Sequence, residues 1–267
     1  MAKFLYFKTL KESFKQVFKN YQLFVPLILN ILFGLATIPF YTNFYSADSF
    51  STSAFVLMML FVPVSAVAGF LLYGWLFALV RNVAQKKKIN LTESFSEGLS
   101  LAWKYFKVML ALMLLLIIAA AAIGLITLVG FLLYLIPVVG IVLIVIVILL
   151  IFFLFLVALL ALFYLTPIMI LEKGGAFDSI NLSYHFFMKH KGHTIKMGLI
   201  TFVLLILAYL PALSFQFRTI FASFQGQLIQ PTIASSLYAQ LLSIPVHVLS
   251  IIIIMFYCLA YIQLKNK

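Results

Sequence analysis

The chain is poor in charged residues, and acids are the rarest of them. Six Asp and Glu stand against 18 Lys and Arg in 267 residues. Charged residues make up 9% of the chain and hydrophobic residues 66%, which leaves too few polar groups to cover a soluble surface. The mean hydropathy is +1.21. These shortages exclude an ordinary soluble globular protein and predict an integral membrane protein.

Cysteine is almost absent, since Cys258 is the single thiol of the chain. One cysteine excludes an intramolecular disulfide and the cysteine-rich classes of metal site. Because Cys258 lies in a long apolar segment, we expect its side chain to pack among apolar neighbours.

Charge is missing altogether from residues 108–171, a run of 64 positions without Asp, Glu, Lys, Arg or His. A helix that crosses the ~30 Å hydrocarbon core needs about 20 apolar residues. The run therefore suffices for two crossings, joined by a turn at 137–140. Similar stretches elsewhere predict an all-α polytopic protein whose single membrane domain covers residues 1–267. The six expected spans are 22–44, 54–80, 108–136, 138–170, 197–215 and 237–264.

Basic residues are distributed unevenly around these spans. Seventeen of the 18 Lys and Arg side chains fall in segments that six crossings place on one side, and only Arg218 falls on the other. Cationic segments are retained in the cytoplasm. We therefore expect a protein of the cytoplasmic (inner) membrane with both termini cytoplasmic. No convincing cleavage site follows the apolar stretch from Leu23 to Phe40, which we interpret as a retained first helix rather than a signal peptide.

The net charge of +12 suggests an anionic partner, either nucleic acid or lipid. Because the basic residues flank membrane-crossing segments, the pattern favours the anionic headgroups of the cytoplasmic leaflet. We expect no nucleic-acid partner.

Three cytoplasmic segments repeat one pattern, in which an acid is followed directly by a serine. The serines Ser13, Ser94 and Ser179 are 81 and 85 residues apart, and each segment precedes a pair of apolar spans. This spacing predicts three repeats, about 9–80, 90–170 and 175–264, each an interfacial amphipathic helix followed by a transmembrane hairpin. Two crossings per repeat restore the orientation, so the repeats should be parallel and related by a pseudo-threefold axis along the membrane normal.

The acids of these repeats have a structural explanation. Each lies three residues after a predicted helix N-cap, where its carboxylate can bond the N–H of the cap and meet the positive helix end. This favours a structural role over chemistry, for which the three acids would have to converge. The predicted pairs of cap and acid are Thr9 with Glu12, Asn90 with Glu93, and Gly175 with Asp178.

After each cap the apolar residues follow helical spacing, and in the first segment Lys8, Lys11, Lys15 and Lys19 occupy the other face. Such a stripe suits a helix at the headgroup boundary, with aromatic side chains toward hydrocarbon and lysines toward lipid phosphate. Packing on a cytoplasmic partner is the alternative. The three stripes are Leu10, Phe14, Val17, Phe18 and Tyr21; Phe95, Leu99, Trp103 and Phe106; and Phe177, Ile180, Tyr184, Phe187 and Met188.

Signs of chemistry are few. His247 is the only Asp, Glu, Lys, Arg or His within the expected spans, and such residues mark substrate or proton pathways in many transporters. A packing role is favoured, with substrate contact or protonation as the alternative. His185, His190 and His193 cluster, but no acid or cysteine stands nearby to complete a metal site. We predict no catalytic residue, metal ligand or cofactor, and no enzymatic activity.

The segment from Tyr164 to Tyr184 places a proline, an apolar stretch, an acid, two glycines and a serine-bearing helix in that order. Pro167, Glu172, Gly174, Gly175 and Ser179 carry the pattern. It resembles a signature of the YciC-like family of bacterial inner-membrane proteins, and it looks similar to the membrane domain fused to some glycerophosphodiester phosphodiesterases. The resemblance implies six helices in the cytoplasmic membrane and brings no activity or catalytic residue. Hydrolysis of lipid diesters is not transferred, because the soluble phosphodiesterase domain is not in this sequence.

Together these features favour a non-enzymatic integral membrane protein that organises envelope components or acts as an adaptor. The alternative is a permease or carrier for a lipid or another hydrophobic solute, which can cross without buried charges. A polar cavity open to one side would favour the carrier, and a tightly packed bundle with an exposed apolar groove the adaptor. Lipid is the expected partner, and a membrane-protein partner remains open.

Overall fold

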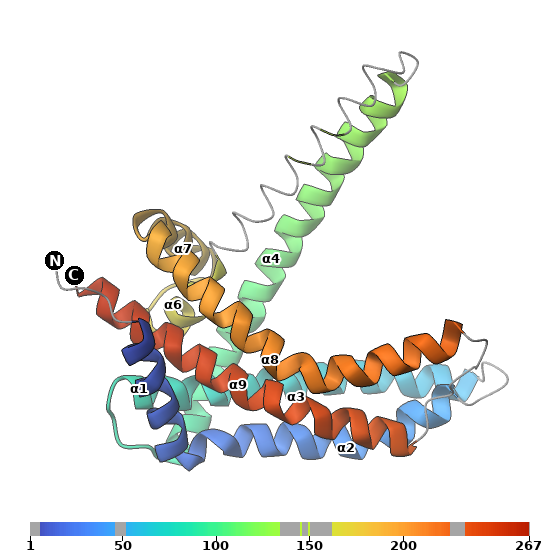
Figure 1. Ribbon diagram of the computed structural model, residues 1–267, viewed down its shortest axis with the longest axis horizontal. Coiled ribbons are helices and arrows are strands. Elements are labelled where there is room, and N and C mark those ends of the chain that lie inside the picture. The colour runs from blue at the N-terminus through green and yellow to red at the C-terminus, as the bar shows by residue number, and fades with distance from the viewer. Residues whose placement is uncertain are drawn as a thin grey trace. The chain divides into compact units, whose positions relative to one another are not determined.

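The computed structural model of this chain describes residues 6–45, 52–133, 145, 149, 162–224 and 233–266. All regular structure in these residues is helical, as the sequence predicted, and it comprises eight α-helices and one short 3₁₀ helix (Figure 1). The helices are α1 (Tyr6–Lys19), η1 (Tyr21–Phe24), α2 (Val25–Tyr45), α3 (Thr52–Ala84), α4 (Leu91–Leu133), α6 (Leu165–Leu171), α7 (Ala176–Lys189), α8 (Lys191–Phe224) and α9 (Ile233–Lys265).

Five segments in the described part of the chain are long and apolar enough to cross a membrane. Each of them overlaps one of the six predicted spans. Of the remaining predicted span, 138–170, the structure describes only residues 145, 149 and 162–170. The sixth span and the threefold repeat therefore stay predictions. The five segments are Tyr21–Ile38, Met59–Ala84, Leu91–Ile118, Lys191–Phe215 and Ile233–Lys265.

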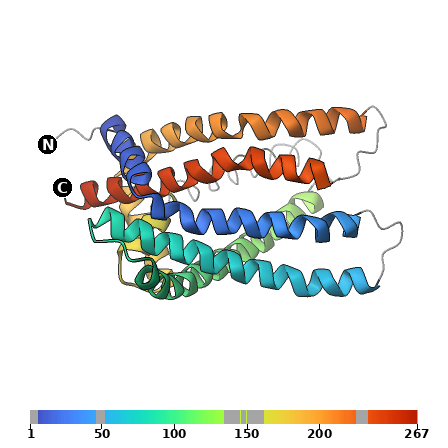
Figure 2. The same ribbon diagram turned by 90° about the horizontal axis from the view of Figure 1, so that it is seen from below.

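The chain divides into two compact units, one formed by residues 1–103 and 199–267 and the other by residues 104–198. In the first unit α2, α3 and α9 pack against one another, and α1 lies beside the C-terminal turns of α9 (Figures 1 and 2). The first helix is thereby joined to the last.

Side chains of the first unit are most completely buried near one end of its helices, in the last turns of α3 and the second half of α9. Lipid chains are as apolar as these side chains, so close van der Waals contact rather than the hydrophobic effect holds such helices together. The buried residues include Leu76, Phe77, Leu79 and Val80 of α3, and Ile251, Ile252, Met255, Phe256, Cys258 and Tyr261 of α9. The expected packing of Cys258 is thus confirmed.

Two glycines let α3 approach the start of α4 closely. A β-carbon added to Gly98 would lie 2.7 Å from the Cα atom of Trp75, and one added to Gly74 would overlap the carbonyl oxygen of Gly98. Small residues at a contact of this kind are typical of membrane helices. The backbones touch at this crossing because neither residue has a side chain.

The predicted interfacial helix and third span form one continuous helix, α4, and are not separate elements. The residues between Phe95 and Val108 include only one glycine and no proline, and Lys104 and Lys107 are good helix formers, so nothing there ends the helix. By contrast, Asn20 ends α1, because its side-chain amide donates to the carbonyl of Gln16 at 2.7 Å and competes with helical bonding. His190 likewise separates α7 from α8.

Candidate functional site

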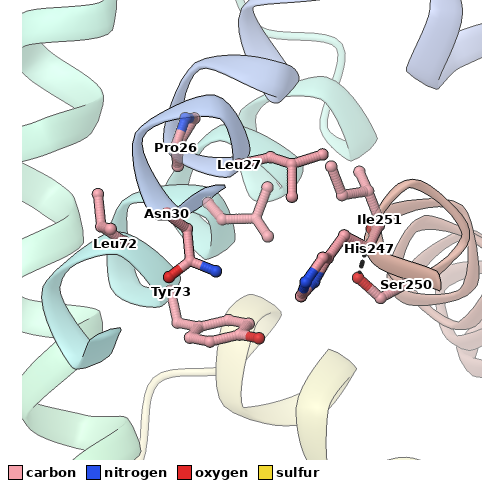
Figure 3. A pocket seen from close by; sticks show the side chains of 9 residues that line it. Pro26, Leu27, Asn30, Leu72, Tyr73, His247, Ser250 and Ile251 are labelled. Atoms are coloured by element: carbon pink, nitrogen blue, oxygen red, sulfur yellow. Dashed lines mark hydrogen bonds between the residues drawn. The ribbon is translucent and has the colours of Figure 1, made fainter. Parts of the chain in front are cut away.

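A small cavity lined mainly by apolar surface lies among α2, α3 and α9 of the first unit, and His247 is on its wall. Figure 3 shows the His247 ring and the Asn30 carboxamide facing each other across the cavity, with the Tyr73 ring beside them. The centre of a water molecule can explore about 20 Å³ of it. The remaining lining residues are Pro26, Leu27, Leu72, Leu76, Ser250 and Ile251.

The turns of α9 around His247 are shaped by a proline and two serines. Pro245 lies inside the helix and lacks the N–H that would bond one turn back. The hydroxyls of Ser243 and Ser250 donate to the carbonyls of Gln240 and His247, each at 2.6 Å. Both serine hydroxyls therefore bond backbone carbonyls of α9. The His247 imidazole lines the cavity.

The size of this cavity limits what it can hold. A space of ~10–15 Å³ for the probe centre is enough for one water molecule, whereas sites for small organic ligands are an order of magnitude larger. Imidazole, carboxamide and phenol groups can bind water or a single hydroxyl. No carboxylate lines the cavity, so its chemistry is that of hydrogen bonding. The sequence singled out His247, whereas Asn30 and Tyr73 join it at the cavity only through the packing of the helices.

Two of the three predicted caps are found in the structure. The Asn90 side chain accepts from the backbone N–H groups of Thr92 at 3.1 Å and Glu93 at 3.4 Å, so it caps α4. Asp178 accepts from the backbone N–H of Gly175 at 2.9 Å at the start of α7. Because glycine has no side chain, the reciprocal bond of a full capping box cannot form there.

The predicted cap at Thr9 is wrong, because α1 already includes Tyr6 and places Thr9 inside the helix. The Thr9 hydroxyl donates instead to the side-chain oxygen of Gln263 in α9 at 3.1 Å. Glu12 is consequently within the helix as well, and its carboxylate accepts from the Gln16 side chain at 2.6 Å. The helix begins before Thr9 because none of Tyr6, Phe7 and Lys8 is a helix-breaking residue.

The three serines shared by the predicted repeats are all buried. Their exposed fractions are 0% for Ser13, 0% for Ser94 and 2% for Ser179. Ser13 and Ser179 each donate to the carbonyl four residues earlier, at 2.8 and 2.9 Å. Ser94 accepts from the Asn82 side chain of α3 at 3.1 Å. In each segment, then, the serine faces the protein interior.

Most of the predicted aromatic stripe faces outward. Phe18 of α1 is 59% exposed, Trp103 of α4 59% and Phe177 of α7 65%. Val17 and Phe187, which the sequence assigned to the same stripes, are buried. Each segment is therefore attached to its unit through a narrow face and presents aromatic side chains away from it.

In the second unit, the motif that carries the family resemblance builds a small core around α6. Tyr164 is fully buried, with its ring 4.7 Å from that of Phe186 and its hydroxyl 3.6 Å from the sulfur of Met197. Pro167 lies in the first turn of α6, where its missing N–H costs no helical bond. Lys104 donates to the carbonyls of Met169 at 2.9 Å and Glu172 at 3.0 Å and so satisfies the C-terminal end of α6. These contacts give the motif a structural role.

The histidine cluster lies around the junction of α7 and α8. The rings of His190 and His193 are 6.3 Å apart, and the described residues contain no group of three or more His, Cys, Asp or Glu placed to hold a metal ion. Burial, together with nearby Lys189 and His193, lowers the pKa of His190. His190 therefore favours its neutral form, and His185 remains exposed on α7.

These observations define a class: an all-helical protein embedded in a membrane through several apolar helices. No protein-family model, curated protein or solved structure matches this chain.

Proposed function

We propose that this chain is a non-enzymatic multi-pass protein of the cytoplasmic membrane that organises or links envelope components. α1, the first turns of α4 and α7 would be its contact surfaces. The charge distribution supports six spans with both termini in the cytoplasm, and the order of residues in 164–184 supports a relationship to the YciC-like family.

One observation carries this proposal: each segment buries its serine (Ser13, Ser94 or Ser179) and exposes aromatic side chains. In α1, Thr9 and Ser13 are buried, while Phe7, Phe18 and the following Tyr21 are exposed. A helix tied to its unit keeps its aromatic side chains at a fixed height, where they can contact the lipid boundary or a partner helix. Lysines beside them suit an anionic surface.

Photo-crosslinking in intact cells tests the proposal. A benzophenone amino acid would replace Phe7, Trp103 or Phe177, and matched controls would carry it at Leu116 and Leu207, which are exposed on apolar spans. We expect the three aromatic positions to crosslink to one and the same membrane protein and the controls to lipid alone. Crosslinks to lipid alone at all five positions would contradict the adaptor.

A carrier is the second candidate, and the observation that favours it is the cavity to which Asn30, Tyr73 and His247 contribute polar groups. Its water-sized volume argues against a bulky cargo. In proteoliposomes, the adaptor predicts that a fluorescent phospholipid crosses the bilayer no faster than in empty vesicles. Faster movement that His247→Leu abolishes would favour the carrier.

A further inference from the structure

The turn after α3 contains a lysine in a backbone conformation that suits glycine. Lys86 has a φ of 58° and is the non-glycine residue with positive φ in the described part of the chain. Its N–H bonds the carbonyl of Val83 at 3.0 Å, and the N–H of Lys87 bonds that of Asn82 at 2.8 Å. This pair of bonds forms a Schellman motif, whose left-handed position usually holds glycine. Lys86 is therefore strained where glycine would not be.

The turn is fixed in place at both ends. On the α3 side, Arg81 pairs with Glu97 at 2.5 Å, and the Asn82 side chain donates to Ser94 at 3.1 Å. On the α4 side, Asn90 caps the helix. Lys86 and its neighbours consequently project from a rigid support, which lowers the entropy that a ligand would have to remove.

Three cations lie together on this support, because Lys86, Lys87 and Lys88 are consecutive and all exposed. The turn directly follows the apolar segment Met59–Ala84, so a membrane crossed by that segment would have its headgroups near the turn. The Glu97 carboxylate is already bound to Arg81. The turn thus keeps a net positive charge.

We propose that the turn 86–88 is a binding site for the phosphate groups of anionic glycerophospholipids. In this site the ammonium group of Lys86 compensates for the backbone strain that its position imposes. The proposal requires only that the chain is embedded in a membrane, and it stands whether the protein is an adaptor or a carrier.

Native mass spectrometry of the full chain tests the site, with phosphatidylglycerol and phosphatidylcholine offered in equal amounts. Each lysine near the surface is worth about a fivefold preference for anionic lipid. Changing Lys86, Lys87 and Lys88 together to Gln should lower the preference about a hundredfold. The control changes the same three lysines to Arg, which keeps the charge and should keep the preference. An equal loss in both variants, or no loss in either, would overturn the site.

Single substitutions separate charge from folding. Lys86→Gly should raise the midpoint of thermal unfolding, because glycine relieves the strain, and should also weaken the preference for anionic lipid about fivefold. Lys87→Gly should weaken the preference similarly without raising the midpoint. An unchanged preference in Lys86→Gly would show that this lysine does not bind lipid. Displacement of the bound lipid by millimolar glycerol phosphate would show that the site takes a soluble phosphate instead.

Discussion

Single glycines decide how closely α3 and α4 pack. At Gly98 the nearest atoms belong to the backbone of Trp75, which cannot rotate away as a side chain can. The same crossing brings the Trp75 ring edge-on to Phe95, with centroids 5.3 Å apart. A methyl group here would have to push two helices apart.

We predict that Gly98→Ala lowers the free energy of unfolding by about 1–3 kcal/mol, the usual cost of overpacking. Thermal unfolding in detergent would measure the change. Gly69→Ala in α3 is the matched control, since nothing lies within 4 Å of its added β-carbon. It should stabilise by about 0.5–1 kcal/mol, because alanine is the better helix former. Equal effects of the two substitutions would contradict the close crossing.

The acids of the three predicted repeats differ in role although their sequence pattern is shared. Asp178 bonds the N–H of Gly175 at the start of a helix, whereas Glu12 bonds a side chain inside one. Asp178→Ala should therefore cost about 1 kcal/mol of stability, as the loss of a helix cap does. Glu12→Ala should cost less than about 0.5 kcal/mol, the value of an exposed pair on one helix. Chemical unfolding would measure the loss of stability in each variant. An equal loss in both would indicate that Glu12 caps its helix as Asp178 does.

The caps show what a sequence can reveal at this scale. Asn90 and Asp178 were predictable because their bonds reach only two or three residues along the chain. Thr9 was not, because its partner Gln263 is 254 residues away. The cavity around His247 escaped prediction for the same reason, since Asn30 and Tyr73 come from other helices.

At the scale of helices, the face of α1 and of α7 that packs inward carries two hydroxyl side chains and one apolar side chain, and is not the more apolar face. In α1 the buried positions are Thr9, Ser13 and Val17, spaced four residues apart. In α7 they are Ser179, Ser183 and Phe187. In water an amphipathic helix buries its apolar face, but beside lipid the apolar face can remain outside and small residues allow the closer approach. The sequence predicted separate helices for α1 and α7 but wrongly for the start of α4, and it could not say which face the protein would cover.

We predict that Ser13→Leu detaches α1 from α9. The added side chain has no room at a fully buried position, so the bond from Thr9 to Gln263 should be lost with the contact. Hydrogen exchange of the α1 amides should then accelerate, while the rest of α9 stays protected. Lys11→Leu, at an exposed position of the same helix, is the control and should leave exchange unchanged. Unchanged exchange in Ser13→Leu would contradict the attached α1.

At the scale of the whole molecule, the number of crossings determines which compartment each terminus occupies. An odd number places the termini on opposite sides of the membrane and an even number places them on the same side. Five candidate segments are found in the described residues, and the sixth predicted span falls mainly on residues 138–161, outside them. The compartments of the two termini therefore test whether the sixth predicted span, 138–170, crosses the membrane.

We predict an even number of crossings, because a cytoplasmic position for both ends keeps 17 of the 18 basic residues on the side where cations are retained. Single cysteines at Lys11, Lys87 and Lys189 should resist a membrane-impermeant maleimide in intact cells and react after permeabilisation. A cysteine at Gln225 should react in intact cells. The native Cys258 is buried and gives little background. If Lys11 and Lys189 reacted from opposite sides, residues 108–171 would cross the membrane only once, and the proposal of three parallel hairpins would fail with the sixth span.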